Sequence, residues 1–332
     1  MATSDSLLAR AASLVPMLRT HAAAAEKARR VPQESLDALS AAGIFTMTAP
    51  KAFGGVEADF QTQCDVLAEI ARGCPSTSWV ATIYSAMSWL VGVFPDETQQ
   101  EIFADRDPRI AGVFSPTGTA VETDGGFVVN GRWPFNTGCH GATWTVLNVL
   151  VGELPTCMLA KSADLTILDD WYATGMSATG SNTVVAENVF VPSHRAMPLP
   201  DMLEAKYPAR HNSDNPYFNY PMAPVLTVNA GGTPIGTARG AWDAFVERLP
   251  GRGITYTTYT NKAATFRRSR TMPSCTRRPA SSCAAESSAV CLPTRCCTDQ
   301  LPTSNSQLPT TPNAQAPIES GSELGIGIGS GW

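Results

Sequence analysis

Two stretches near the middle of the chain decide the fold prediction: Trp133-Pro134-Phe135-Asn136-Thr137-Gly138 and Gly175-Met176-Ser177-Ala178-Thr179-Gly180-Ser181-Asn182-Thr183. Both place small hydroxyl residues beside glycines, in a region whose composition favours β-strands. Because glycine has no side chain, backbone amides and hydroxyl oxygens can approach a flat polar ligand closely there. Such a surface suits a flavin ring, so we expect both stretches to belong to a flavin site.

The residues around these stretches are typical of β-strands. Asp124-Gly125-Gly126 is a hairpin signal, and β-branched and aromatic residues dominate five segments: 110–115, 127–135, 143–151, 156–160 and 183–191. We expect them to form a small sheet or barrel. It would make up a flavin-binding middle β domain, residues 110–222.

Helical periodicity precedes the β region. Apolar residues recur every three or four positions from Leu7 to Leu18, Pro32 suits a first helical position, and Gly43 suits a helix end. Helices are expected over residues 7–29, 32–42, 59–72, from 75 onward, and 96–103. Residues 1–109 would then form an N-terminal all-α domain.

One segment requires a membrane test, because residues 73–95 carry no charge and are long enough to span a bilayer. The segment contains six serine and threonine residues and has no basic flanking clusters, which favours a buried core helix. The formal net charge of -5 argues against a nucleic-acid partner, and no secretory signal is recognisable at the start. We therefore expect a cytoplasmic protein that binds neither nucleic acid nor membrane.

Helical pattern returns after a connection over residues 207–224. Gly232, Gly236 and Gly240 recur at every fourth position, which predicts a smooth helix face for close contact with another helix. This helix, over residues 227–249, would begin a C-terminal helical domain at residues 223–264. The sequence after it offers no helix to receive that face.

The composition changes from residue 265 onward. Leu, Ile, Val and Phe supply 9 of the last 68 residues, which is too few for a core. Five of the nine cysteines fall here, at spacings that match no metal motif. We expect residues 265–332 to be disordered, or to be the product of a frameshift near residues 263–266, which would leave the C-terminal helical domain incomplete.

Helices, a sheet and then a helix, with these motifs in the sheet, make the chain resemble the acyl-CoA dehydrogenase superfamily. The closer resemblance is to its flavin-dependent monooxygenase branch, the oxygenase components of two-component aromatic hydroxylases. It covers about residues 29–261 and rests on the order and spacing of these motifs: Val31-Pro32 with residues 39–45, then 50–55, 73–79, 130–142, 175–192 and 232–240. The implied fold is α+β and multidomain, with an all-α N-terminal domain, a middle β domain and an incomplete C-terminal helical domain.

The resemblance implies that the middle domain packs the flavin against the first stretch and that the Thr137 hydroxyl bonds near the reactive ring nitrogen. We therefore expect Thr137 to act in catalysis and these residues to bind the cofactor: Trp133, Phe135, Asn136, Thr137 and Gly138. The residues alone leave alternatives open. A strand-end threonine can bond its own backbone, and Phe135 and Trp133 could be core aromatics.

Three further hydroxyl residues are candidate flavin ligands, each with a plain turn role as the alternative: Ser115, Thr179 and Ser181. In the second stretch, family members usually carry an arginine after Gly-Met, where this chain has Ser177. The contact made by that arginine is therefore in doubt here.

His140 closely follows the first stretch and could act as an acid, a base or a hydrogen-bond donor, with a structural or exposed role as the alternative. No cluster of His, Cys or carboxylate residues has the ligand spacing of a zinc or iron site, so no metal is expected.

The resemblance implies an oxygenase that receives reduced flavin, FMN in preference to FAD, from a partner flavin reductase. With O2 it would hydroxylate an aromatic or polyketide-like substrate. One alternative is an acyl-CoA dehydrogenase, which oxidises an acyl thioester with a glutamate base. The other is an inactive fragment, because the family's C-terminal helices close the pocket and build a homotetramer. Whether this chain is an active enzyme stays open from the sequence.

Overall fold

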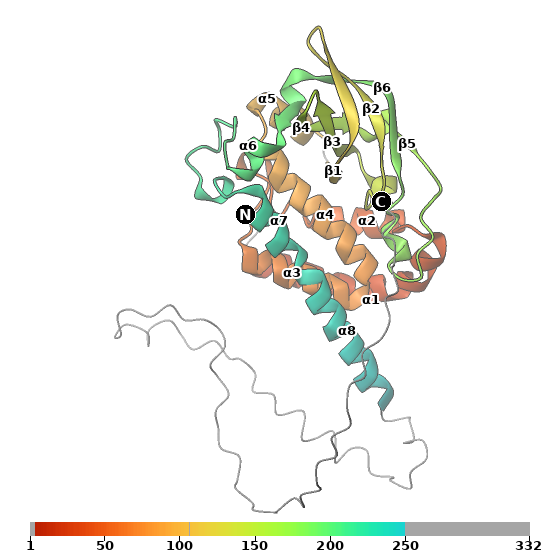
Figure 1. Ribbon diagram of the computed structural model, residues 1–332. Coiled ribbons are helices and arrows are strands. Elements are labelled where there is room, and N and C mark those ends of the chain that lie inside the picture. The colour runs from red at the N-terminus through yellow and green to blue at the C-terminus, as the bar shows by residue number, and fades with distance from the viewer. Residues whose placement is uncertain (1–3, 106, 250–332) are drawn as a thin grey trace, which may run out of the picture. The chain divides into compact units, whose positions relative to one another are not determined.

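The computed structural model describes residues 4–105 and 107–249, which belong to the first compact unit of the chain, Met1–Arg268. Helices come first, then one seven-stranded sheet, then helices again, which confirms the predicted fold class for these residues (Figure 1). The disorder or frameshift expected over residues 265–332 lies outside the described residues. The domain limits at residues 109, 222 and 264 stay predictions.

The N-terminal helices lie close to their predicted positions: α1 (Ser4–Ala28), α2 (Gln33–Ala41), α3 (Phe60–Gly73), α4 (Pro75–Val91) and α5 (Asp96–Phe103). Pro75 opens α4, and the Asp59 carboxylate accepts the Thr62 amide at the start of α3, 2.7 Å away. Almost all of α4 is buried, between α3 and the sheet, so the uncharged segment is a core helix. No helix in the described ranges is long and apolar enough to cross a membrane.

The seven strands follow the spatial order β5-β6-β2-β1-β3-β4-β7: β1 (Ile110–Thr123), β2 (Gly126–Trp133), β3 (Trp144–Val151), β4 (Leu154–Lys161), β5 (Thr166–Ile167), β6 (Val184–Pro192) and β7 (Ala196–Pro198). Strands β1 and β3 are parallel, and the remaining pairs in this order are antiparallel. The predicted hairpin joins β1 to β2, with Thr123 opposite Gly126. Strand β1 is longer than predicted, because it continues past a register shift between Val113 and Gly118. The short edge strands β5 and β7 were not predicted.

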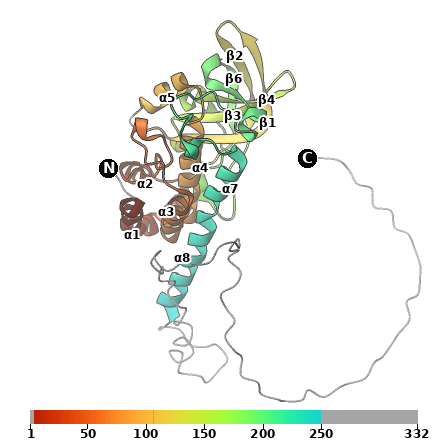
Figure 2. The ribbon, with the colours of Figure 1, turned by 90° about the vertical axis from the view of Figure 1, so that its left-hand side faces the viewer.

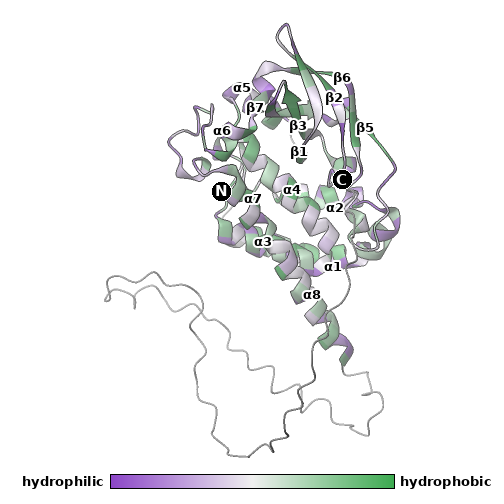
Figure 3. Ribbon diagram, in the orientation of Figure 1, coloured by the Kyte–Doolittle hydropathy of each residue, from purple (hydrophilic) through white to green (hydrophobic). Residues whose placement is uncertain are grey.

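The centre of the sheet is apolar on both faces. The first six residues of β3 are all buried, and Figure 3 shows this strand in hydrophobic green. Trp133, at the end of β2, has no exposed surface, and its indole Nε1 donates to the Asn148 carbonyl at 2.8 Å. Trp133 is therefore a core aromatic of the sheet.

Three helices follow the sheet: α6 (Leu199–Leu203), α7 (Met222–Ala230) and α8 (Gly232–Arg248). Helix α7 begins inside the predicted connection, so the predicted single helix is in fact two, divided at Gly231.

The predicted glycine face of α8 is confirmed, but its partner was missed. A Cβ atom added at Gly236 would lie 2.0 Å from the Ala68 carbonyl oxygen, and one at Gly232 would lie 2.7 Å from the Cys64 carbonyl oxygen. Both acceptors are on α3, which lies beside α8 in Figure 2. The face therefore packs on the N-terminal helices, and the expectation that it has no partner was wrong.

Polar contacts join α8 to two helices of the N-terminal domain, α4 and α3. The Thr233 hydroxyl lies 2.7 Å from that of Ser78 on α4, and Asp243 accepts an ion pair from Arg72 of α3 at 2.8 Å. Other positions of α8 carry half-exposed apolar side chains: Ile235, Trp242 and Phe245.

Candidate functional site

The two glycine-flanked stretches meet in the structure and form one wall. The Thr137 and Ser181 hydroxyl oxygens lie 2.9 Å apart, and the Gly138 amide donates to the Thr179 carbonyl at 2.9 Å. The Asn136 amide also donates, to the Asn182 carbonyl at 3.2 Å. We call the surface formed by residues 135–138 and 179–182 the glycine-loop wall.

Three hydroxyl groups form a chain behind this wall. Ser181 bonds Thr137 on one side and Thr179 on the other, at 2.7 Å. Thr137 and Ser181 are each 6% exposed and Thr179 is 2% exposed. All three hydroxyl residues are therefore buried, and Ser181 links Thr137 to Thr179.

The wall carries one exposed aromatic ring, that of Phe135, and buried polar atoms near this ring have no hydrogen-bond partner among the described residues. Phe135 is 70% exposed, has a left-handed φ of 62°, and meets the Trp171 ring edge-on at 6.1 Å. Both side-chain polar atoms of Asn136 and the indole nitrogen of Trp171 are buried. Among the described residues, none of these three atoms has a hydrogen-bond partner. An exposed aromatic ring beside unpaired donors and acceptors fits a flat ligand with polar edges, such as a flavin.

Gly138 allows the wall to approach helix α4. Its φ of 76° is left-handed, and an added Cβ would lie 2.9 Å from the Tyr84 ring. The buried Tyr84 hydroxyl donates to the Gly138 carbonyl, and burial raises the pKa of this phenol far above its usual value, so it stays a donor. The sequence analysis missed Tyr84, because it lies in an uncharged helix whose residues resemble core.

Replacing Tyr84 by phenylalanine is expected to lower the free energy of unfolding by about 1–2 kcal/mol, since a buried carbonyl loses its donor while the ring stays in place. Urea denaturation measures the change. Tyr172→Phe is the control, because Tyr172 is exposed and its hydroxyl donates to an exposed carboxylate, that of Asp169. Equal effects of the two substitutions would contradict a structural bond to Gly138.

His140 lies at the end of the wall, with its ring exposed and held by Asn182. The Asn182 side-chain amide donates to the Leu168 carbonyl at 2.7 Å, which identifies its oxygen as the acceptor for His140 Nε2 at 2.9 Å. His140 Nε2 therefore carries a proton, and Nδ1 remains open for another partner. Asn182 belongs to the second stretch, yet it was not among the predicted site residues.

The remaining predicted residues, Ser115 and Trp133, differ in exposure. Ser115 is exposed on the irregular part of β1, and Trp133 is in the sheet core. Ser177, at the position where an arginine was expected, donates its amide to the Glu26 carboxylate at 2.9 Å. In the described ranges no group of His, Cys, Asp or Glu side chains could hold a metal ion.

Two buried cysteines give a direct test of this packing. Burial raises the pKa of Cys139 and of Cys157 to about 12. Since the raised values leave only ~1 in 10,000 of each thiol ionised at pH 8, both are expected to resist iodoacetamide in the native protein and to react after denaturation in urea. Site-resolved mass spectrometry measures this, and rapid native labelling of Cys139 would contradict the closed wall.

Comparisons with known proteins identify the family. The family described as "Acyl-CoA dehydrogenase, N-terminal domain" matches residues 11–106. The FADH(2)-dependent resorcinol hydroxylase oxygenase component of Rhizobium sp. (strain MTP-10005) is 32% identical over 254 residues, which are 74% of this chain and 62% of that protein. The crystal structure of 3-HSA hydroxylase from Rhodococcus sp. RHA1 is 32% identical with a TM-score of 0.71, over 80% of this chain and 70% of the other. The chain belongs to the flavin-dependent monooxygenases of the acyl-CoA dehydrogenase superfamily.

A second solved structure supports the same branch of flavin-dependent monooxygenases. XiaF from Streptomyces sp., in complex with FADH2 and glycerol, is 30% identical with a TM-score of 0.71, over 80% of this chain and 69% of XiaF. The chain spans about 62% of the length of the resorcinol hydroxylase component. The resemblance inferred from the sequence motifs is thus confirmed.

Proposed function

We propose that this chain acts as the oxygenase component of a two-component monooxygenase, and that it hydroxylates an aromatic substrate with reduced flavin and O2. The observation that supports the proposal most is the glycine-loop wall, where a held hydroxyl at Thr137 lies beside the exposed ring of Phe135. The names of the relatives, as hydroxylase components, agree with it. A separate flavin reductase would supply the cofactor in the cytoplasm, and we propose the family's homotetramer as the working assembly.

The residues of the wall fit a flavin in distinct ways. Thr137 would hydrogen-bond the ring near its reactive nitrogen, and Phe135 would contact its face. The two polar atoms of the Asn136 side-chain amide have no hydrogen-bond partner in the described structure. Because they are buried, the loop would have to move before a flavin edge could bond them. Bound reduced flavin would supply the activation of O2, while the chain holds the ring and excludes water.

We propose reduced FAD as the preferred cofactor, in place of the FMN that the sequence favoured. Two of the relatives that are at least 30% identical carry FADH2 in their names. Anaerobic titration of the full chain with reduced FAD and reduced FMN tests the preference. Tighter binding of FMN would reverse it.

The activity test supplies the full chain with reduced FAD from an independent reductase, together with O2 and resorcinol or 4-hydroxyphenylacetate. Formation of a hydroxylated product is expected, in an amount beyond that of a reaction without the chain. If the chain binds flavin and no product forms with any phenol tested, the inactive-fragment alternative holds. Bleaching of bound oxidised flavin by an acyl-CoA would instead favour the dehydrogenase alternative.

A further inference from the structure

A cavity of about 320 Å³ lies beside His140. The N-terminal helices and the sheet domain both contribute to its lining, which includes Arg29, Arg30, His140, Leu168, Asp169 and Asn182. The cavity shares Asn182 with the glycine-loop wall and contains His140, and the proposed hydroxylation gives no role to the rest of its lining. The cavity is therefore a candidate binding site in its own right.

The carboxylate in this cavity, that of Asp169, is already paired with a positive charge. The Asp169 carboxylate accepts an ion pair from Arg29 at 2.7 Å, and its other oxygen accepts the Tyr172 hydroxyl at 2.8 Å. The Arg29 bond, followed by the Tyr172 bond, lowers the pKa of Asp169, so this group stays ionised and paired. The Arg29 guanidinium also stacks over the Tyr172 ring at 3.9 Å, which fixes the pair in place.

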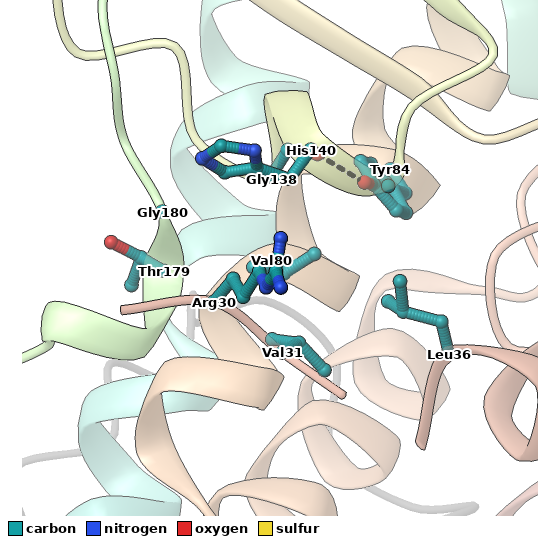
Figure 4. Close-up of a pocket in the computed structure, with 10 residues that line it drawn as sticks. Arg30, Val31, Leu36, Val80, Tyr84, Gly138, His140, Thr179 and Gly180 are labelled. Atoms are coloured by element: carbon teal, nitrogen blue, oxygen red, sulfur yellow. Dashed lines mark hydrogen bonds between the residues drawn. The ribbon is translucent and has the colours of Figure 1, made fainter. Parts of the chain in front are cut away.

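The neighbouring Arg30, unlike Arg29, is paired with no carboxylate of the described residues. Within the part of the chain that the structure describes, its side chain has no ion pair and no hydrogen bond. Figure 4 draws the adjoining pocket, which Arg30 and His140 also line, and shows Arg30 rising from the segment after α1 toward the loop of His140. The cavity therefore contains one guanidinium whose charge is not balanced by a carboxylate.

His140 adds a directed polar atom to the same space. Asn182 accepts the Nε2 proton of His140, so Nδ1 is the ring nitrogen left for a ligand. Nδ1 accepts a hydrogen bond in the neutral ring and donates one in the protonated ring. A bound anion would favour the protonated ring. Arg30 and His140 thus supply two donors that can act on one anionic group.

We propose that this cavity binds a small organic carboxylate, about one aromatic ring in size, through Arg30 and His140. The volume lies at the low end of the range for ligand pockets, ~300–1,000 Å³, so it suits a single-ring acid better than a dinucleotide. A guanidinium matches the two oxygens of a carboxylate in one plane. The proposal does not depend on the proposed hydroxylation, because no flavin takes part in it.

Calorimetric titration of the full chain without flavin tests the site with three probes: benzoate, its neutral analogue benzamide, and phenyl phosphate. Benzoate is expected to bind, and benzamide to bind at least about tenfold more weakly. Arg30→Gln and His140→Gln are each expected to weaken benzoate binding by about tenfold. Arg239→Gln, on the exposed side of α8, is the matched control and should leave benzoate binding unchanged.

Several outcomes would overturn the proposal. They are no benzoate binding, equal binding of benzoate and benzamide, or an equal loss in the Arg239→Gln control. Tighter binding of phenyl phosphate than of benzoate would replace the carboxylate by a phosphoryl ligand. Circular dichroism of each variant confirms its fold, and two independent substitutions keep the test valid if one of them fails to fold.

Discussion

Replacing Gly236 by valine is expected to lower the free energy of unfolding by about 3 kcal/mol. An added Cβ at this position lies 2.0 Å from the Ala68 carbonyl oxygen and 2.6 Å from its Cα, far inside any permitted contact. The neighbouring atoms are backbone and cannot rotate away, so α8 would have to move off α3, and overpacking of this kind typically costs ~1–3 kcal/mol or more. Urea denaturation followed by circular dichroism measures the loss.

Ala238→Val is the matched control, because Ala238 lies on the exposed side of the same helix. At this exposed position, only the weaker helix propensity of the β-branched valine lowers the free energy of unfolding, by about 0.5 kcal/mol at most. Similar losses in the two variants would mean that the close approach of α8 to α3 does not exist in solution.

Replacing Thr137 by valine is expected to slow hydroxylation about a hundredfold, on the proposed function. Valine keeps the shape of threonine but removes the hydroxyl that is hydrogen-bonded to Ser181 and that we propose bonds the flavin. The loss of one hydrogen-bond donor to a developing oxyanion costs ~100- to 1,000-fold in kcat in other enzymes, and we expect an effect at the low end of this range. Binding of reduced flavin, measured anaerobically by absorbance, should weaken about tenfold in the same variant.

The Thr137→Ser variant distinguishes the effect of the hydroxyl on the reaction from the effect of the methyl group on packing. It keeps the hydroxyl and loses a methyl group, so we expect most of the activity to remain. If the serine variant loses as much activity as the valine variant, the methyl contact and not the hydroxyl matters. If neither variant changes flavin binding or turnover, Thr137 does not contact the cofactor.

Sequence patterns located the main helices and strands well, because residues close together in the chain favour each of them. The apolar periodicity of α1, the proline at the start of α4 and the turn at Gly125 act through neighbours a few residues apart. The short edge strands β5 and β7 and the helix α7 lack such signals. They form because a neighbouring strand or helix is available to pair with them.

The candidate site divides in the same way. Thr137 and Phe135 could be selected from the sequence, since the motif around them is continuous. Tyr84 could not, because its role depends on a carbonyl more than fifty residues away. Asn182 acquires a role only from the ring that it orients, that of His140.

The sequence by itself determined the family, because the two glycine-flanked stretches and the other motifs between residues 29 and 261 are specific in their order and spacing. Only the tertiary structure brought the Thr137 hydroxyl into a buried chain with those of Ser181 and Thr179, which lie more than forty residues away in the sequence. Only the tertiary structure supplied α3 as the partner of the Gly236 face. The physical reason is that burial and helix contact depend on atoms far apart in the chain, whereas strand and helix preferences depend on near neighbours.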